Sequence, residues 1–388
     1  MLNGKLLIVF SDEYGRHPSS CEHIIKVLLE YDNEILWVNT IGMRTPQMTI
    51  NDVKRSFEKV SSWIKKPHAG HKTAASNFAV SNPFMIPFNK YSLVRTINTA
   101  SVKNAVCEQV KGNDRGKPIV IASVTNVADY IKLFDAGAVV YYCVDDYVEW
   151  PGADRQLVVE MEEKLLRESD IVLATADDLC DKKVRDGKRP HFLPHGVDYQ
   201  HFDSYREQQY RDLFAGIKPP IIGFFGAVSA WLDFELIVET AINHPAWSFV
   251  FIGPADTDIG KLIGIPNIHL VGKVAYSELP KYAAWFDVAI IPFLVNSLTI
   301  SVNPLKLIEY LACGLPVVSV DLPEVRKFGE VAYISDRHSP FGKCIELALV
   351  EDNELLRQKR KSVARSFSWE SIAQKFSDLV EPIWAANS

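Results

Sequence analysis

The sequence predicts an α/β protein built from two Rossmann-like halves. Short apolar runs alternate with helical patterns along most of the chain, which is typical of parallel sheets covered by helices on both faces. The length of 388 residues suits two or three domains. A polar segment at 203–216 separates the two series of runs. We therefore expect an N-terminal domain over 1–205, a C-terminal domain over 206–368 and a last helix over 369–388.

Each half contains short runs rich in Val, Ile, Leu and aromatic residues, which predict strands. In the first half these strands lie at 5–10, 34–39, 118–122, 138–143, 171–174 and 191–193. Helical patterns in that half cover 20–30, 90–111, 127–135 and 154–169. In the second half, with helices between them, strands are expected at 221–226, 248–252, 268–271, 288–291, 317–319 and 331–334.

Composition is that of an ordinary globular protein, with 47% hydrophobic and 23% charged residues. The net charge of −6 argues against general nucleic-acid binding, so we expect no nucleic-acid partner. The six Cys lack Cys-x-x-Cys spacing and indicate reduced thiols in a cytoplasmic protein. The first apolar run is too short for a signal peptide, and no run reaches the length of a membrane span. Any membrane contact would therefore be peripheral.

Residues 50–100 break the alternation and mix basic with apolar side chains. The basic ones are Lys54, Arg55, Lys59, Lys65, Lys66, His68, His71 and Lys72. Interspersed among them are Phe57, Trp63, Phe78, Phe84, Met85, Ile86 and Phe88. Such a segment could lie on the anionic inner face of the cytoplasmic membrane. The alternative is a solvated insertion whose aromatic side chains fold inward.

The stretch from Asn303 to Ser319 predicts a loop, a helix, a glycine turn and a buried strand. Asn303 suits the N-cap, and Pro304 suits the first helical position. Lys306 and Glu309 are three residues apart, so they share one helical face near the helix start. A helix N-terminus with a cation in its first turn can bind an anion, and a carboxylate one turn later can accept hydrogen bonds from sugar hydroxyls. Together these groups could hold a sugar nucleotide.

This stretch resembles the donor-binding half of GT-B glycosyltransferases of the group 1, family 4-like set. Their pattern is Glu-x7-Glu followed by Ala-x-Ala-Cys-Gly-x-Pro-Val-Val, and Glu309 matches the second Glu, which the resemblance implies binds the ribose. Ser301 stands in place of the first Glu, and the turn at 223–228 lacks the family's Arg and Lys. In this respect the chain is similar to membrane-associated glucuronosyltransferases of the xanthan type and to teichuronic-acid-type transferases. There a Lys occupies the place of Lys306, which implies that Lys306 meets the diphosphate.

The resemblance implies two Rossmann-like domains whose parallel sheets face a central cleft, with a C-terminal helix that crosses back to the first domain. It implies a metal-independent, hexosyltransferase-type enzyme without a cofactor. The substrates would be a nucleoside-diphosphate sugar, with UDP expected, and a cell-surface glycan or lipid-linked acceptor. The expected donor-binding residues follow strands of the second half or lie near the motif: Gly226, Ala227, Gly253, Lys273, Val274, Ser301, Val302, Asn303, Leu305, Lys306, Glu309 and His195.

Two carboxylates, Asp145 and Asp146, follow the strand at 138–143. The carboxyl end of a central strand is where open α/β sheets place their ligand crevice. One of the two could take a proton from an acceptor hydroxyl, but adjacent residues point in different directions. The resemblance aligns Asp146 with the catalytic base and leaves Asp145 to acceptor binding or to a supporting role. Capping of the next helix and a metal-binding motif of a GT-A enzyme are the alternatives.

Polar loops follow the first two expected strands. Arg16, His17 and Ser19 in the first loop and Arg44 in the second are candidates to bind an anionic or pyrophosphate-linked acceptor. For each of them a solvated loop is the alternative. His195 lies in Pro-His-Gly-Val-Asp, which resembles a signature that closes the first domain of these transferases. It could donate to a phosphate, or belong to a purely structural turn.

Three other functions stay open at this level. A non-hydrolysing sugar-nucleotide epimerase has the same two-domain architecture and needs no acceptor. A GT-A-type enzyme would be inactivated by EDTA. A non-catalytic sugar-nucleotide-binding partner is suggested by Ser301 and by the missing basic pair after Gly226. The stereochemical outcome is also open, because Asp146 as base suggests inversion whereas the Glu-x7-Glu relatives mostly retain.

Overall fold

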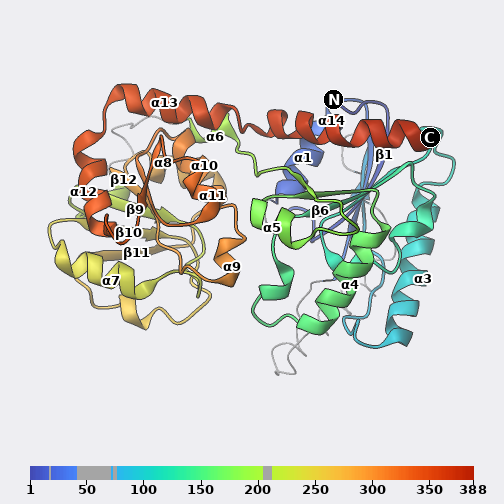
Figure 1. Ribbon diagram of the computed structural model, residues 1–388, viewed down its shortest axis with the longest axis horizontal. Coiled ribbons are helices and arrows are strands. Elements are labelled where there is room, and N and C mark those ends of the chain that lie inside the picture. Colours follow the sequence, from blue (N-terminus) through green and yellow to red (C-terminus); the bar gives the residue numbers. More distant parts are fainter. Residues whose placement is uncertain (17–18, 42–70, 73–76, 204–211) are drawn as a thin grey trace. The chain divides into compact units, whose positions relative to one another are not determined.

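The computed structural model describes residues 1–16, 19–41, 71–72, 77–203 and 212–388 (Figure 1). The chain forms two compact units. Unit 1 comprises Met1–Pro194 together with Ile372–Ser388, and unit 2 comprises His195–Ser371. Each unit is a sheet of parallel strands covered by helices, which confirms the predicted α/β class.

Unit 1 contains an eight-stranded sheet in the order β3-β4-β2-β1-β5-β6-β7-β8. The described neighbours pair in parallel, except that β3 is antiparallel to β4. The central strands are buried on both faces because their sequences are continuous apolar runs. The strands are β1 Leu6–Ser11, β2 Glu34–Asn39, β3 His71–Lys72, β4 Phe78–Ser81, β5 Ile119–Ala122, β6 Ala138–Cys143, β7 Ile171–Ala174 and β8 His191–Phe192.

Polar side chains fix the starts of two helices in unit 1. Ser19 caps α1 by accepting a hydrogen bond from the Glu22 amide, and Asp154 caps α4 by accepting one from the Leu157 amide. The α-helices of unit 1 are α1 Ser20–Leu29, α3 Ser92–Gln109, α4 Arg155–Glu168 and α5 Asp177–Lys182, together with most of α14.

The helix expected over 127–135 does not form. Two 3-10 turns, Thr125–Val127 and Ile131–Phe134, occupy this region instead. Tyr130 between them leaves helical geometry (φ −133°, ψ 0°), and its ring packs against Phe10 with centroids 5.4 Å apart. Packing of this buried ring outweighs the local helical pattern. The strand β4 was not expected, because it lies within the irregular segment 50–100.

Unit 2 contains a six-stranded parallel sheet in the order β11-β10-β9-β12-β13-β14. Its strands are β9 Ile221–Phe225, β10 Ser248–Ile252, β11 Ile268–Gly272, β12 Val288–Ile291, β13 Val317–Val320 and β14 Ala332–Ser335. Its α-helices are α6 Tyr199–Phe202, α7 Phe234–Asn243, α8 Leu279–Ala283, α9 Ser297–Ile300, α10 Leu305–Ala312, α11 Pro323–Arg326, α12 Phe341–Glu351 and α13 Glu354–Arg365.

Unit 2 begins at His195 rather than at residue 206, where the sequence places the boundary. The reason is that the segment after His195 packs into the core of unit 2. Val197 is buried there and its amide donates a hydrogen bond to the Phe367 carbonyl over 2.8 Å. Phe202 stacks on Phe225 with ring centroids 5.8 Å apart.

The last helix, α14, runs from Trp369 to Asn387, and its residues from Ile372 onward belong to unit 1 (Figure 1). Trp384 anchors its end. The Trp384 indole N–H donates to the Lys117 carbonyl over 2.8 Å, and Lys5 Nζ lies 3.4 Å from the centre of the ring. Within the described ranges, none of the helices combines the length and the apolar character needed to cross a membrane.

Candidate functional site

The start of α10 places Lys306 and Glu309 as an ion pair. Lys306 Nζ lies 2.8 Å from Glu309 Oε2; the Lys306 side chain is 24% exposed and that of Glu309 only 2%. The helix begins at Leu305, with Pro304 as its N-cap in extended geometry (φ −74°, ψ 104°). The expectation that Asn303 caps the helix is therefore wrong by one residue, because Pro304 has not yet entered helical geometry. Lys306 is the second residue of the helix.

Tyr310 fixes α10 against the end of β9. The Phe225 amide donates a hydrogen bond to Tyr310 Oη over 3.0 Å, and the two rings meet edge to face at 4.7 Å. Lys306 Nζ lies 5.2 Å from the centre of the Phe225 ring. Since both Tyr310 and Phe225 are buried, the position of Lys306 over the end of β9 is set by the core.

Two glycines beside Lys306 allow the turns after β9 and β10 to approach each other closely. Gly226 (φ 143°) follows β9 and Gly253 (φ 151°) follows β10. A Cβ on Gly253 would lie 1.9 Å from the Gly226 carbonyl oxygen, and one on Gly226 would lie 3.2 Å from Lys306 Cε. Only glycine fits this geometry. Their own amides are occupied, because Gly226 donates to the Ile252 carbonyl and Gly253 donates to the Gly272 carbonyl, each over 2.8 Å. The glycines thus allow the turns after β9 and β10 to pack against each other and do not offer donors, and Ala227 follows Gly226.

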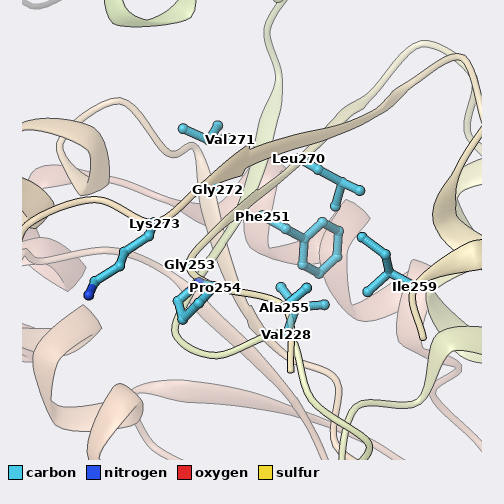
Figure 2. A pocket seen from close by; sticks show the side chains of 10 residues that line it. All are labelled: Val228, Phe251, Gly253, Pro254, Ala255, Ile259, Leu270, Val271, Gly272 and Lys273. Carbon is cyan, nitrogen blue, oxygen red and sulfur yellow. The ribbon is translucent and has the colours of Figure 1, made fainter. Parts of the chain in front are cut away.

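A cavity of about 320 Å³ opens on the other side of Gly253 (Figure 2). Its walls are mostly apolar, and they come from the ends of β9, β10 and β11: Val228, Phe251, Gly253, Pro254, Ala255, Ile259, Leu270, Val271, Gly272 and Lys273. Lys273 is exposed, and its ammonium end points away from the Phe251 ring (Figure 2). Val274, the next residue, is half-buried. Gly253 therefore connects this cavity to the turn at Gly226 and, through it, to Lys306.

The loop before α10 buries two of the expected donor residues. Ser301, which replaces the family's first Glu, is buried and its hydroxyl lies within hydrogen-bonding distance of the Ser297 carbonyl (3.4 Å). Asn303 is also buried, and Val302 between them is half-buried. The site therefore has no carboxylate at position 301, and among the residues that the structure describes Lys306 forms an ion pair with Glu309.

The positive charge of Lys306 acts on the imidazole of His195. Burial, and after it the positive charge of Lys306, lowers the pKa of His195 to about 4. The imidazole is therefore neutral at pH 7. The neighbouring position 196 requires glycine for packing, because a Cβ there would lie 2.5 Å from the Trp369 ring.

In unit 1 the two carboxylates after β6 have different surroundings. Asp146 is 5% exposed, and both its oxygens are held: Lys182 Nζ lies 3.1 Å from Oδ2 and Lys183 Nζ lies 3.3 Å from Oδ1. Asp145 is partly exposed. Burial, and after it the charge of Asp146, raises the pKa of Asp145 to about 7. The two neighbours are thus suited to different tasks.

The lysines that hold Asp146 come from α5 and its C-terminal end. Lys183 also pairs with Glu162 of α4 at 2.7 Å, and the Tyr141 hydroxyl donates to the other oxygen of Glu162 over 2.7 Å. The sequence does not predict that these lysines contact Asp146, because they are distant from it in the chain. The acidic residues at the start of α5 are the only local pattern near these lysines, and such a pattern is typical of a solvated helix face.

The predicted acceptor residues are only partly described. Ser19 is the cap of α1, so its hydroxyl oxygen already accepts a hydrogen bond, and Arg16 is exposed in the preceding turn. His17 and Arg44 lie outside the described residues. A residue that the sequence did not suggest lies nearby in the fold: Asn126, after β5, has a buried side-chain oxygen without a hydrogen-bond partner in the described part of unit 1. Within the same described part, no three His, Cys, Asp or Glu side chains are grouped to hold a metal ion.

A family model and a known relative that match this chain both describe glycosyltransferases. Residues 219–341 match the family model described as glycosyl transferases group 1. TuaH of Bacillus subtilis (strain 168), a protein assigned to teichuronic acid biosynthesis as a glycosyltransferase, is 27% identical over 259 residues. The matched region covers 61% of this chain and 65% of TuaH, a little less than two thirds of that relative's length.

Several solved structures share the fold over nearly the whole chain. Sucrose-phosphate synthase from Thermosynechococcus elongatus has a TM-score of 0.73 at 13% identity, covering 98% of this chain and 100% of that one. A glycosyltransferase from Rickettsia africae has a TM-score of 0.69 at 12% identity, with 100% of both chains covered. Anabaena HepE, in complex with UDP and glucose, has a TM-score of 0.65 at 13% identity, covering 96% and 98%. The chain has the GT-B fold, and its residues 219–341 match the group 1 glycosyltransferases.

Proposed function

We propose that this protein transfers a hexosyl group from a UDP-sugar to a hydroxyl of a cell-surface glycan or of a lipid-linked precursor. The observation that carries the proposal is the corner where Lys306, the start of α10 and the Gly226–Gly253 turn meet. A diphosphate needs positive charge, free helix N-terminal amides and room for its oxygens. This corner supplies the positive charge of Lys306 at the start of a helix within unit 2.

The cavity beyond Gly253 suits the nucleoside part of the donor. Its volume of about 320 Å³ is at the lower end of the range for small-molecule sites, and its floor includes the flat ring of Phe251. A base placed there would lie on one side of Gly253 and its diphosphate on the other, beside Lys306. UDP is the nucleotide in the Anabaena HepE complex, and it is the nucleotide that we propose here.

Departure of the diphosphate would be assisted by Lys306. As the bond between sugar C1 and the diphosphate breaks, negative charge grows on the leaving oxygen, and a fixed cation lowers the free energy of that transition state. Glu309 holds the ammonium group in place at 2.8 Å. We propose that no divalent metal is needed, and the paired state of Asp146 supports this, because a metal there would have to displace two lysines.

The proposal is tested by measuring the melting temperature of the full chain with UDP-, GDP-, ADP- and dTDP-sugars, each with and without magnesium. A ligand that binds only the folded state raises the melting temperature by mass action. We expect UDP-sugars to give the largest rise, with no requirement for magnesium. No rise with any nucleotide would contradict the proposal.

Turnover separates the other candidate functions. The chain is incubated with the best UDP-sugar, first alone and then with a crude lipid-linked acceptor fraction. A transferase releases UDP faster when acceptor is present. An epimerase converts the sugar without acceptor, and a binding partner shows a thermal shift but no product in either case. Conversion of the sugar without acceptor, or a thermal shift without product, would contradict the transferase proposal.

We further propose peripheral contact with an anionic membrane through unit 1. Five large apolar side chains are exposed around the start of α3: Phe84, Phe88, Tyr91, Leu93 and Ile97. Partition into vesicles of anionic lipid should fall in the double variant Tyr91→Ser, Leu93→Ser. The control is Val350→Ser, since Val350 is even more exposed than Tyr91 and Leu93 but belongs to unit 2. Equal partition of all three proteins would contradict this contact.

A further inference from the structure

We infer that His201 is a positioning residue of the cavity beside Gly253, because it holds the turn at 273–276 that follows β11. The contact is a hydrogen bond to the Tyr276 carbonyl, 75 residues later in the chain. The inference rests on the proposed transferase function, since it requires a nucleoside in that cavity. All the groups involved belong to unit 2.

The turn after β11 needs support from outside the sheet. β11 is the first strand of the six-stranded order, so its pairing in this sheet is with β10, and that pairing ends at Gly272. Leu270 and Val271 are each 38% exposed. Residues 270–273 nevertheless form one wall of the cavity (Figure 2). An edge strand is held by backbone hydrogen bonds on one side only, so a second contact is needed to fix this wall where the strand ends.

His201 supplies that second contact. Its Nε2 lies 3.0 Å from the Tyr276 carbonyl oxygen. Because a carbonyl only accepts hydrogen bonds, Nε2 carries the hydrogen and donates it. The same imidazole stacks on the Tyr276 ring, with centroids 4.7 Å apart and 18° between the planes. One side chain therefore holds both the backbone and the ring of the third residue after Lys273.

His201 is itself fixed to the core of unit 2. The Asp198 side chain caps α6 by accepting a hydrogen bond from the His201 amide over 3.1 Å. Phe202 is fully buried, and it meets the His201 ring edge to face at 4.9 Å and the Tyr276 ring at 5.7 Å. Phe202 also stacks on Phe225 at the end of β9. The turn after β11 is thus tied through His201 to the core.

This arrangement predicts which part of the donor depends on His201. A wall that already stands in its bound position costs less ordering when a ligand arrives, so loss of the contact lowers the affinity for the nucleoside. The diphosphate corner is set by other contacts, because Tyr310 holds the start of α10 against Phe225. Affinity for a nucleotide and affinity for pyrophosphate should therefore respond differently. UMP and inorganic pyrophosphate are the two probes.

The test is isothermal titration of the full chain with each probe. His201→Phe keeps a ring that can stack and loses the donor, whereas His201→Gln keeps an N–H donor and loses the ring. We expect His201→Phe to bind UMP about 3- to 10-fold more weakly, the usual effect of one hydrogen bond. His201→Gln should restore most of the affinity. Both variants should bind pyrophosphate like the wild type.

Steady-state kinetics gives a second readout of positioning. With a UDP-sugar as donor, His201→Phe should raise KM by about the same 3- to 10-fold and leave kcat unchanged, because the nucleoside is held equally in the ground state and the transition state. A fall in kcat with unchanged KM would contradict the inference.

His244→Gln is the matched control. His244 is also a stacked histidine of unit 2, with its ring 3.9 Å from that of Trp247 and 3° between the planes. It precedes β10, so it lies at the amino ends of the strands, whereas the cavity lies at their carboxyl ends. His244→Gln should bind both probes like the wild type. A loss of UMP affinity equal to that of His201→Phe would point to general loosening of unit 2 and overturn the inference.

Three further results would overturn the inference. His201→Phe could bind UMP with wild-type affinity. His201→Gln could bind UMP more weakly than His201→Phe, which is the order that packing of the ring alone predicts. Pyrophosphate affinity could fall as much as UMP affinity. In each case wild-type protein still binds UDP, so the proposed function stands. If wild-type protein binds neither UMP nor UDP, the proposed function fails, and the inference fails with it.

Discussion

At the residue scale, Gly253 is the described glycine with the least room for a side chain. Both Gly253→Ala and Gly264→Ala place a side chain on a residue with positive φ, but the Cβ at 264 meets no atom within 4 Å. We expect Gly264→Ala to cost about 1–2 kcal/mol from backbone strain alone. Gly253→Ala should cost about 2–5 kcal/mol, because overlap with the Gly226 carbonyl is added to that strain. Urea unfolding with a probe in unit 2 measures both.

The same pair of variants reports on the donor site. Gly253→Ala should also abolish the thermal shift with UDP, because any relaxation pushes the Gly226 turn toward Lys306. Gly264→Ala should keep that shift. Equal effects of the two substitutions on UDP binding would show that the Gly253 turn does not contact the donor.

His195 predicts a specific pH dependence of stability. Its folded pKa of about 4 lies below its ordinary value of 6.5, so the unfolded chain binds a proton there first as the pH falls. The stability that the neutral imidazole provides is present above pH 6.5 and is lost between about pH 6.5 and 4. His195→Gln should therefore lose less stability than the wild type over that interval. His191→Gln, at an exposed position of unit 1, is the control and should follow the wild type.

Some residues of the site could be predicted and others could not. The placement of Lys306 and Glu309 on one helical face follows from their spacing of three, and the structure shows it, together with an ion pair between them. The N-cap at Pro304 was missed, because local preference for Asn at caps favours Asn303. The two lysines around Asp146 could not be seen, since only the packing of α5 beside β6 and β7 brings them there.

At the scale of elements, apolar runs bounded by turns were located well. The expected strands at 138–143, 171–174, 248–252 and 288–291 match β6, β7, β10 and β12 in full. Each is a short, largely apolar and mostly buried run, for which no helical alternative of that length competes. Neither β4 nor the 3-10 turns around Tyr130 could be located, because both depend on rings packed from distant parts of the chain.

The contacts of Trp384 that hold the end of α14 in unit 1 can be tested by substitution. Trp384→Ala removes the hydrogen bond to the Lys117 carbonyl and the contact with the Lys5 ammonium. We expect the C-terminal turns of α14 to lose about 1–2 kcal/mol of protection, the sum of a typical hydrogen bond and a cation–π contact. Hydrogen exchange followed by mass spectrometry reads this directly. Glu381→Ala, on an exposed face of the same helix, should leave exchange unchanged, and equal protection in both variants would contradict the anchor.

At the scale of the whole molecule, the sequence contains two series of alternating strand and helix patterns, and these predict two units. The polar segment at 203–216 marks the change between them in the sequence. The structure moves the boundary to His195 because Val197 and Phe202 belong to the core of unit 2. A turn that contains His-Gly-Val-Asp gives no local sign of the core that it will join.

The central claim concerns Lys306, and affinity for UDP tests it most directly. Isothermal titration should compare the wild type, Lys306→Ala and Lys327→Ala. Lys327 is a matched control, because it also pairs with a buried glutamate three residues away, Glu324, at 2.6 Å. Lys327 lies at the end of α11 rather than at the start of a helix.

We predict that Lys306→Ala weakens UDP binding by about 10- to 100-fold, since a hydrogen bond to a charged group contributes about 1.5–3 kcal/mol. Lys327→Ala should bind UDP like the wild type. If Lys306→Ala also binds UDP with wild-type affinity, the diphosphate does not lie at the start of α10, and the proposed donor site is contradicted.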